Sequence, residues 1–507
     1  MLLAGLALAA TTAGATTASA TVEQKPQAAA PIDWTACGDY GGECATLKVP
    51  IDYSDPDGPT FDLAIGRIEA LNPAKRAGVL IIHPGGPGAS GINPFILRNA
   101  IPAESALRQN FDFVSLDPRG VGRSTPIKCS LDVVEQAPTA FPATQAEYQS
   151  WLAYNAKLST DCRRQTGPLF DHVDTTNAAR DVDTVRAALG EKQISFFALS
   201  YGTQVGQQYA ELFPQNLRAM AIDSNMDHSI TSAYRYLQTT TEDLEGSFKA
   251  FARWCGQTSA CALNGDNVTA VWDKLHKQAT EGSLKDPETG DPITAEQLRV
   301  LLFESMYDPA GSWFDLAAQL KALAGGQAAK LGATATTKAE TVNYAYPAIW
   351  CSDWKWNVSG FAELDQYRKR LEAQYPHTKL SPFWSDVMTC LNWQGKVTNP
   401  QRRLDITATL VPTLVSKGRY DVGTPAAWNY AAAAQIPNSR ILEHDGVGHG
   451  QYRNSTCART HIETYLTSLK LPPPGTRCAA EYPAQPPATT KATDDRRPVS
   501  ATGRPLH

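Results

Sequence analysis

Between residues 175 and 223 the chain alternates between amphipathic helical segments and short apolar runs, and this alternation narrows the possible folds. A helix is predicted from Thr175 to Gly190, because its apolar side chains recur at helical spacing. A strand is predicted from Gln193 to Leu199, then a helix from Tyr201 to Phe213 and a strand from Ala219 to Asp223. This succession favours an α/β fold with a mostly parallel sheet covered by helices on both faces.

The same pattern occurs earlier in the chain, stops in the middle and resumes after residue 410. The interrupted part, residues 228–402, is mainly helical, poor in strands and rich in Trp and Tyr. An α/β core that carries an inserted helical lid explains this order. We therefore predict a first core part at 35–227, a lid at 228–402 and a second core part at 403–478.

The two ends of the chain are expected to lie outside this core. Residues 1–20 carry no charge, and their apolar run leads to Ala18-Ser19-Ala20, the small-x-small pattern that signal peptidase cleaves. No Lys or Arg precedes the apolar run, as one usually does in a signal peptide. We predict a signal peptide at 1–20, a flexible leader at 21–34 and a disordered Pro-, Ala- and Thr-rich tail at 479–507. The mature protein is therefore expected to be secreted.

Charge excludes several classes of partner. The net charge is −5, from 46 basic and 51 acidic side chains, and no basic run is present to neutralise nucleic-acid phosphates or to bind anionic lipid. No stretch after the signal peptide is long and apolar enough to span a bilayer. We expect a monomer that binds no cofactor, no nucleic acid and, after signal removal, no membrane.

Cysteine usage agrees with export. An even number of cysteines in an exported chain indicates disulfides, and the simplest pairing joins each cysteine to the next one. Their spacing differs from that of zinc sites, so no metal is expected. The ten cysteines are Cys37, Cys44, Cys129, Cys162, Cys255, Cys261, Cys351, Cys390, Cys457 and Cys478.

Ser200 is the candidate nucleophile. It lies between a predicted strand and a predicted helix, where a nucleophile elbow must lie, in the pentapeptide Ala198-Leu199-Ser200-Tyr201-Gly202. The usual pattern is G-x-S-x-G, and Ala198 replaces its first glycine at the cost of one methyl group. A serine hydroxyl also needs a base within reach and a third group that orients the base.

The chain offers a base and an acid in the expected order after Ser200. His449 follows a predicted strand and has glycines on both sides, whereas its rival His444 sits on the strand end itself. Asp421 follows the preceding predicted strand, at 412–416, and its expected role is to hold the tautomer of His449. Asp223, at another strand end, is the alternative acid.

A glycine-rich loop, Gly85-Gly86-Pro87-Gly88, follows the strand at 78–82. The backbone N–H of Gly86, together with that of Tyr201, is predicted to form the oxyanion hole. A phosphate-binding loop is less favoured, because neither a P-loop Lys-Ser/Thr nor a dinucleotide GxGxxG follows.

Five motifs together resemble a known family: HPGGPGASG (83–91), DPRGVGRS (117–124), TTNAARDVDTVRAALG (175–190), SYGT (200–203) and DVGTP (421–425). They are similar to those of the secreted bacterial tripeptidyl aminopeptidases, relatives of the proline iminopeptidases among the α/β-hydrolases. The resemblance covers roughly residues 35–478.

This resemblance implies an α/β-hydrolase fold with Ser200, Asp421 and His449 as nucleophile, acid and base. It also implies that Gly86 is the oxyanion glycine. The sequence departs from the family at Ala198 and at Ser224-Asn225, where relatives more often carry glycine. These departures remove no catalytic group but leave the substrate open.

Three functions are compatible with these residues. The first is a serine exopeptidase that releases short peptides, expected from the resemblance to be tripeptides, from free N-termini. It needs a lid carboxylate for the substrate ammonium, since a buried ammonium requires a partner. Asp353, between tryptophans, and Glu304 are the candidates, with Asp308 as a further one. The alternatives are a secreted carboxylesterase that uses the same triad and an inactive hydrolase fold that serves only for binding.

Overall fold

The computed structural model describes residues 32–38, 41–93, 100–327, 340–407 and 411–487. The predicted signal peptide, most of the leader and the end of the tail lie outside these residues. Among the helices in the described ranges, none combines the length and the apolar character that crossing a membrane requires.

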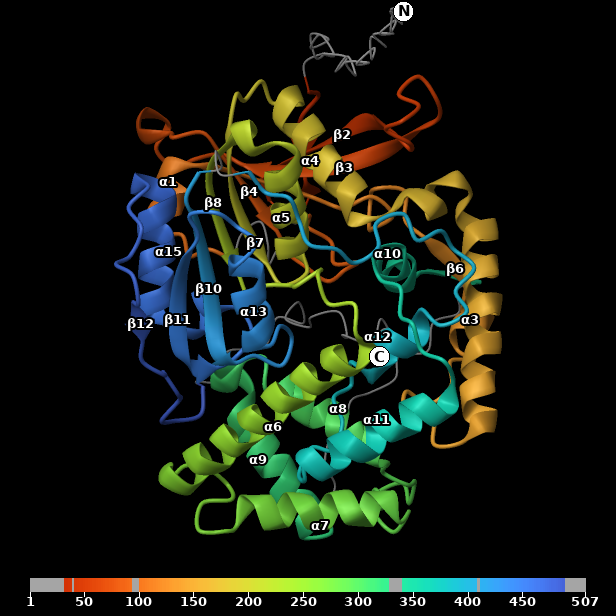
Figure 1. Cartoon of the computed structure of the whole chain (residues 1–507). Helices are drawn as coiled ribbons and strands as arrows, with labels where there is room; N and C mark the ends of the chain where they lie inside the picture. The colour runs from red at the N-terminus through yellow and green to blue at the C-terminus, as the bar shows by residue number, and fades with distance from the viewer. Residues whose placement is uncertain (1–31, 39–40, 94–99, 328–339, 408–410, 488–507) are drawn as a thin grey trace, which may run out of the picture.

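Within the described residues, a ten-stranded sheet forms the centre of the core (Figure 1), in the order β1-β2-β3-β5-β4-β7-β8-β10-β11-β12. The first three strands pair antiparallel, as does β3 with β5, and every neighbouring pair from β5 to β12 is parallel. This mostly parallel sheet confirms the predicted α/β-hydrolase class. The strands are β1 (Thr35–Ala36), β2 (Glu43–Pro50), β3 (Thr60–Ile68), β4 (Val79–His83), β5 (Asp112–Leu116), β7 (Ile194–Leu199), β8 (Leu217–Asp223), β10 (Thr413–Tyr420), β11 (Arg440–Val447) and β12 (Arg477–Cys478).

Helices cover both faces of the sheet because successive strand side chains point to opposite sides. Leu80 and Ile82 of β4 pack with Ile462 on one face. Their neighbour Ile81 belongs to the core of the other face, with Val182. The first face is covered by α1 (Ala106–Asn110) and α15 (Thr456–Ser468), and the second by α4 (Thr175–Ala188), α5 (Gly202–Leu212) and α13 (Ala426–Ala433) (Figure 1).

The chain between β8 and β10 forms a mainly helical layer beside and below the sheet in Figure 1. All of its elements lie within 228–402, the segment for which the lid is predicted. They are α6 (Ala233–Gln257), α7 (Val268–Thr280), α8 (Ala295–Ser305), α9 (Pro309–Ala324), β9 (Thr341–Asn343), α10 (Ala345–Asp353), α11 (Phe361–Gln374) and α12 (Trp384–Thr389).

A second segment joins this layer, although the sequence assigns it to the first core part. It comprises β6 (Lys128–Ser130), α2 (Leu131–Val134) and α3 (Gln145–Thr166). β6 pairs antiparallel with β9, and Asn155 of α3 donates to the carbonyls of Met388 and Leu391 at 2.7 Å each. The helical layer is therefore built from two segments that are far apart in the sequence.

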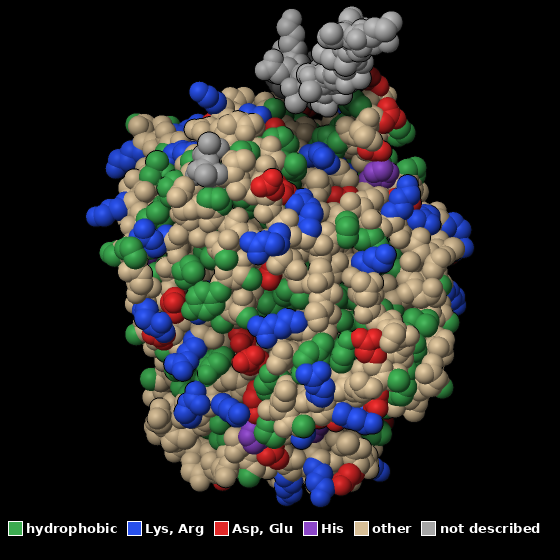
Figure 2. All heavy atoms as spheres, viewed as in Figure 1, with side chains coloured by type: hydrophobic (Ala, Val, Ile, Leu, Met, Phe, Trp, Pro, Cys, Tyr) green, Lys and Arg blue, Asp and Glu red, His purple; other side chains and the backbone are tan. Residues whose placement is uncertain are grey.

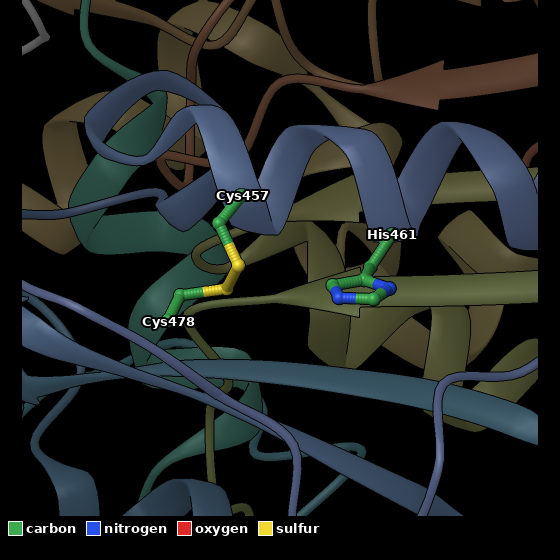
Figure 3. Close-up of side chains that lie close together, drawn as sticks. All are labelled: Cys457, His461 and Cys478. Carbon is green, nitrogen blue, oxygen red and sulfur yellow. A yellow bond between two sulfur atoms is a disulfide. The ribbon is translucent and has the colours of Figure 1, made fainter.

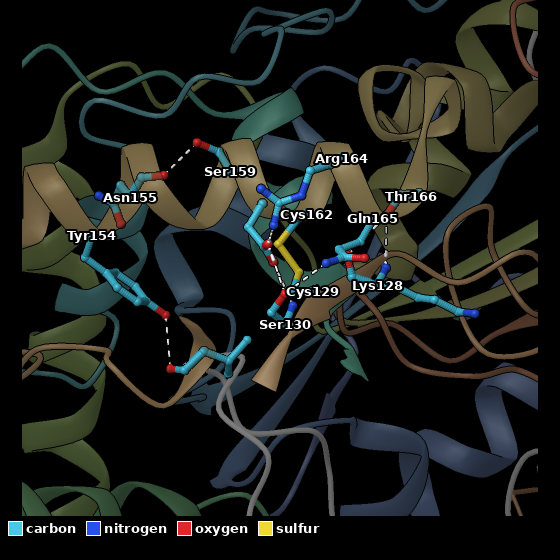
Figure 4. Close-up of a disulfide and its surroundings, with 12 residues drawn as sticks. Lys128, Cys129, Ser130, Tyr154, Asn155, Ser159, Cys162, Arg164, Gln165 and Thr166 are labelled. Carbon is cyan, nitrogen blue, oxygen red and sulfur yellow. Dashed lines mark hydrogen bonds and ion pairs between the residues drawn. A yellow bond between two sulfur atoms is a disulfide. The ribbon is translucent and has the colours of Figure 1, made fainter. Parts of the chain in front are cut away.

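Five disulfides join each cysteine to the next one along the described chain, which is the simplest pairing expected from the sequence. Cys129–Cys162 fastens β6 to α3, where Ser130 also donates to Asp161 of the same helix (Figure 4). The others are Cys37–Cys44, Cys255–Cys261, Cys351–Cys390 and Cys457–Cys478.

His461 lies close to the sulfur atoms of Cys457 and Cys478, a grouping that resembles a set of metal ligands (Figure 3). The two sulfurs are bonded to each other. Because a metal is bound by the thiolate, the disulfide withdraws both sulfurs from coordination. This group instead fastens α15 to β12.

On the face shown in Figure 2, basic and acidic side chains are interspersed rather than gathered into a patch of one sign. This distribution agrees with the nearly balanced charge of the sequence.

Residues 479–487, here called the C-terminal strap, pack against the helical layer, whereas the sequence predicts disorder from 479 onward. Tyr482 lies 4.9 Å from Trp313 of α9, between ring centroids. The Nε1–H of Trp254 in α6 donates to the carbonyl of Pro483 at 2.8 Å. A proline-rich segment is expected to be disordered only where it has no surface to pack against. Here aromatic side chains of the lid provide such a surface.

Ending the chain after residue 478 is expected to destabilise the protein. The change leaves the indole N–H of Trp254 without its acceptor and exposes the ring of Trp313, a loss of about 1–3 kcal/mol. Thermal unfolding should show a lower Tm by a few degrees, on the order expected for such a loss. A chain that ends after residue 487 is the control and should melt like the full chain. Equal melting temperatures for both truncations would contradict the role of the strap.

Candidate active site

Ser200 occupies a sharp turn between β7 and α5, in the middle of the parallel part of the sheet. Its φ is +59°, a left-handed conformation that costs a non-glycine residue about 1–3 kcal/mol. The turn is held by its own backbone: the Ser200 N–H donates to the Asp223 carbonyl, and the Ser200 carbonyl accepts from the N–H and hydroxyl of Thr203. This strained strand–turn–helix geometry is that of a nucleophile elbow.

Two small residues allow this elbow to form. A Cβ atom at Gly202 would lie 2.7 Å from Nδ1 and 2.8 Å from the carbonyl oxygen of His83, so only glycine fits there. Ala198, which replaces the usual first glycine, packs against α5 at Gly206, where even an added Cβ would lie 3.7 Å from the Ala198 Cβ, an ordinary van der Waals distance. The departure at Ala198 is thus accommodated by the packing of α5 on β7.

Asp421 and His449 are brought together by the loops that follow β10 and β11. His449 Nδ1 lies 2.8 Å from Asp421 Oδ1. The carboxylate is fully buried and also accepts the N–H groups of Gly423 and Thr424, at 2.9 and 3.0 Å, and the Thr424 hydroxyl at 3.0 Å. An acid held in this way keeps the proton on Nδ1, which leaves Nε2 as the basic nitrogen.

The loop that carries His449 is braced from the core and from the lid. The Gly450 N–H donates to the Ser224 hydroxyl at 2.8 Å, so Ser224 fastens this loop to the end of β8. From the lid, the Tyr307 carbonyl accepts the His449 N–H at 2.9 Å. The Tyr307 ring meets the imidazole edge-on at 4.9 Å.

The two rival residues lie elsewhere. His444 is buried within β11, where its Nδ1 lies 2.7 Å from Gln451 Oε1 and burial lowers its pKa. The Asp223 carboxylate accepts the Ser416 hydroxyl at 2.6 Å and the Tyr452 N–H at 2.9 Å, and burial raises its pKa. The Asp223 carboxylate is thus used by β10 and the segment after His449, and Asp421 is the carboxylate that faces His449.

The glycine-rich loop passes directly beside the nucleophile. A Cβ atom at Gly85 would lie 3.0 Å from the Cβ and 3.5 Å from the Oγ of Ser200, and Gly86 has a φ of +111°. Among the described residues, neither the Gly86 N–H nor the Tyr201 N–H has an acceptor within the protein. Both N–H groups therefore remain available as hydrogen-bond donors, as the predicted oxyanion hole requires.

Two other motifs support this loop and the helix beside the elbow. The Asp117 carboxylate accepts the Ser90 hydroxyl and the Ile92 N–H, which anchors the end of the glycine-rich motif. Arg119 forms two hydrogen bonds with Asp181 of α4, at 2.6 and 2.7 Å, and both side chains are fully buried. These pairs join three of the sequence motifs to one another in the fold.

Asp353, predicted to bind a substrate ammonium, is placed differently by the structure. It is fully buried at the end of α10, and its oxygens accept the N–H and hydroxyl of Thr175, the amide of Asn399 and the Tyr201 hydroxyl. Burial raises its pKa to about 7. With every one of these donors already at its oxygens, Asp353 ties the lid to α4 and to the residue after Ser200 instead of facing a substrate.

Glu304, the other predicted carboxylate, is half-buried at the end of α8. Its carbonyl accepts the N–H of Tyr307, whose ring contacts His449. Burial raises the pKa of Tyr307, and the charges of Asp421, Asp386 and Glu304 raise it further. Glu304 thus lies on the lid turn that reaches the base. Asp308, the further candidate, caps α9 and forms a 3.5 Å ion pair with Arg453.

Sequence reasoning missed Asp386, a buried carboxyl in α12. It accepts the hydroxyls of Tyr236 and Tyr346 at 2.6 and 2.7 Å, and burial raises its pKa to about 8. A single Asp without a motif gives no signal in the sequence. The three elements that meet at this carboxyl are distant along the chain.

The sequence is similar to those of several known proteins. Residues 377–478 match the family model described as TAP-like protein. The tripeptidyl aminopeptidase of Streptomyces coelicolor is 31% identical, over 87% of this chain and 84% of its own length. Serine protease Hip1 of Mycobacterium tuberculosis is 29% identical, over 90% and 92%, and carboxylesterase B of the same species is 27% identical, over 94% and 96%.

Asp421→Asn is expected to lower kcat by about 10³–10⁴-fold, because an amide no longer holds the tautomer of His449 or stabilises its imidazolium. Asp223→Asn serves as the matched control, since this carboxylate is equally buried but does not touch the imidazole; its loss should stay within about tenfold. Hydrolysis of p-nitrophenyl acetate measures both variants. Equal losses would contradict the assignment of the acid.

Asp386 predicts a pH dependence of stability. Its pKa rises from 3.8 to about 8 on folding, so the folded state keeps a proton that the unfolded chain releases between these values. The free energy of unfolding therefore falls as the pH rises from about 4 to about 8, with a slope of about 1.4 kcal/mol per pH unit. The side chain of Asp386→Asn is neutral at every pH. The Tm of this variant relative to that of the wild type should therefore increase between pH 5 and pH 8. A Tm difference that stays constant over this pH range would contradict the raised pKa of Asp386.

Proposed function

The chain belongs to the tripeptidyl aminopeptidase family of α/β-hydrolases, and from this we propose that it is a serine exopeptidase that releases short peptides, tripeptides in particular, from free N-termini. The observation that carries the proposal is the Asp421–His449 hydrogen bond beside the nucleophile elbow of Ser200.

In the first half-reaction Ser200 Oγ attacks the scissile carbonyl while His449 Nε2 accepts its proton. The negative charge that develops on the carbonyl oxygen is stabilised by the N–H groups of Gly86 and Tyr201. His449 then donates the proton to the leaving amine, and Asp421 stabilises the imidazolium in the interval. The released product is the remainder of the peptide.

In the second half-reaction the N-terminal peptide is esterified to Ser200, and water attacks this acyl group. His449 accepts the proton of the water, and the Ser200 hydroxyl leaves as it regains a proton from the imidazolium. The same two N–H donors stabilise the second tetrahedral intermediate.

Exopeptidase specificity requires a group that binds the free α-ammonium. We assign this role to Glu304, which lies on the turn before Tyr307 and is half-buried. A half-buried carboxylate keeps part of its hydration when it pairs with an ammonium. This ion pair therefore has a smaller desolvation cost than one with a deeply buried carboxylate. Asp386 is less suited, because burial raises its pKa to about 8 and leaves it largely neutral near pH 7.

Export is part of the proposal. The predicted signal peptide supports it, and so do the five disulfides within the described chain, because such bonds persist in oxidising surroundings.

A carboxylesterase is the second candidate. The similarity to carboxylesterase B over 94% of this chain favours it, since esters and amides pass through the same type of tetrahedral intermediate.

A tripeptide p-nitroanilide with a free N-terminus should be cleaved with a kcat/KM about 100-fold or more above that of its N-acetylated form, because acetylation removes the charge that pairs with the lid carboxylate. Release of p-nitroaniline gives both values, and mass spectrometry of a longer peptide reports the number of residues released. Equal turnover of the two substrates would sink the exopeptidase proposal and favour the esterase.

The same substrates test Glu304. Glu304→Gln should raise KM for the free peptide about tenfold or more and leave the acetylated one unchanged. Glu296→Gln is the control, since Glu296 lies in the same helix, is also half-buried and accepts from Thr139 at the far end. An equal effect of both changes would contradict the role of Glu304.

A further inference from the structure

The loop that carries Asp421 is held from outside by a residue of the lid. Asp243 lies in α6, the first helix after β8, and its side chain is buried. Its Oδ2 accepts the backbone N–H of Asp421 and that of Ala426, both at 3.0 Å. One carboxylate oxygen therefore binds the two ends of the turn formed by residues 421–426.

The inside of this turn depends on Asp421 itself, whose side chain accepts the N–H groups of Gly423 and Thr424. The outside depends on Asp243. Ala426 is the first residue of α13, and Pro425 before it offers no side-chain cap. Asp243 takes the place of that cap, with a negative charge at the positive end of the helix dipole.

The surroundings of Asp243 make this a costly arrangement. Burial raises its pKa to about 7, with a smaller contribution from Asp421 and from Glu242 of α6, while the two backbone N–H groups act in the opposite direction. Lys417 of β10 is the neighbouring cation. Burial lowers the pKa of Lys417, and the charge of Asp243 acts in the opposite direction. A carboxyl kept here against this cost points to a function for the contact it makes.

We propose that Asp243 is a positioning residue that holds Asp421 in line with His449, so that helix α6 of the lid is part of the catalytic apparatus as well as a cover. Its effect on the reaction passes through the turn and not through the substrate. The inference rests on the proposed triad but not on the nature of the substrate.

Glu245 provides a matched control. It lies two residues further along α6, is also buried, and its Oε2 likewise accepts a backbone N–H, that of Thr378 at 2.9 Å, together with the hydroxyl of the same residue. Both carboxylates thus accept backbone N–H groups, but Glu245 does so within the lid, away from the turn of Asp421. Asp243→Ala, Asp243→Asn, Glu245→Ala and Glu245→Gln form the set of variants.

Two readouts report on Ser200 without a peptide: the rate constant of labelling by a fluorophosphonate, and kcat and KM for p-nitrophenyl acetate. We expect Asp243→Ala to lower the labelling rate and kcat about 10- to 100-fold with KM within threefold, because the turn loses its two acceptor contacts. Asp243→Asn should recover most of this loss, since its amide oxygen accepts the same two N–H groups.

The rescue by Asp243→Asn and the behaviour of the Glu245 variants separate positioning from mere stability. Both Glu245 variants should label within threefold of the wild type and keep its kcat and KM, even where their melting temperatures fall.

Three results would overturn the inference: wild-type labelling by Asp243→Ala, an equal loss of labelling in Glu245→Ala, or an Asp243→Asn variant as impaired as Asp243→Ala. The proposed function fails in a different way, by equal cleavage of free and acetylated peptides, and that result leaves these measurements unchanged. A wild-type protein that does not label at all would contradict both.

Discussion

The buried hydrogen bond between Asp421 and His449 is the interaction on which the rest of the structure depends. Its two residues come from loops after neighbouring parallel strands, so the sheet sets only their approximate separation. Final alignment requires that each loop be held from outside. Ser224 and Tyr307 hold the loop of His449, and Asp243 holds that of Asp421. Two of these three supports belong to the lid, so the lid cannot be treated as a separate cover.

Buried carboxyls hold the lid together and attach it to the core. Asp243 binds the turn of the acid, Asp353 binds the start of α4 and the hydroxyl of Tyr201, and Asp386 gathers two tyrosines. Burial raises the pKa of each, which means that each costs stability near neutral pH. Hydrogen bonds are directional, whereas apolar contacts are not. The loops around a triad must be held in one orientation, which hydrogen bonds can impose.

Much of the architecture could be predicted from local patterns. The helix and strands around Ser200 follow from apolar spacing, and the sequential pairing of the cysteines follows from their order along the chain. Three features could not be predicted. Helix α3 joins the lid through contacts with residues more than 200 positions away, the strap at 479–487 packs on aromatic side chains, and Asp353 is used for support. Each depends on a surface that exists only after distant segments have met.

The sequence by itself determined which residue types are present for catalysis and in what order: a serine between strand and helix, then two carboxylate candidates and two histidines at strand ends. The tertiary structure decided among them. Asp421 faces His449, while Asp223 accepts from Ser416 and His444 pairs with Gln451 inside the sheet. The physical reason is that a hydrogen bond depends on ångström-scale placement of side chains, and no spacing along a chain encodes that distance between loops.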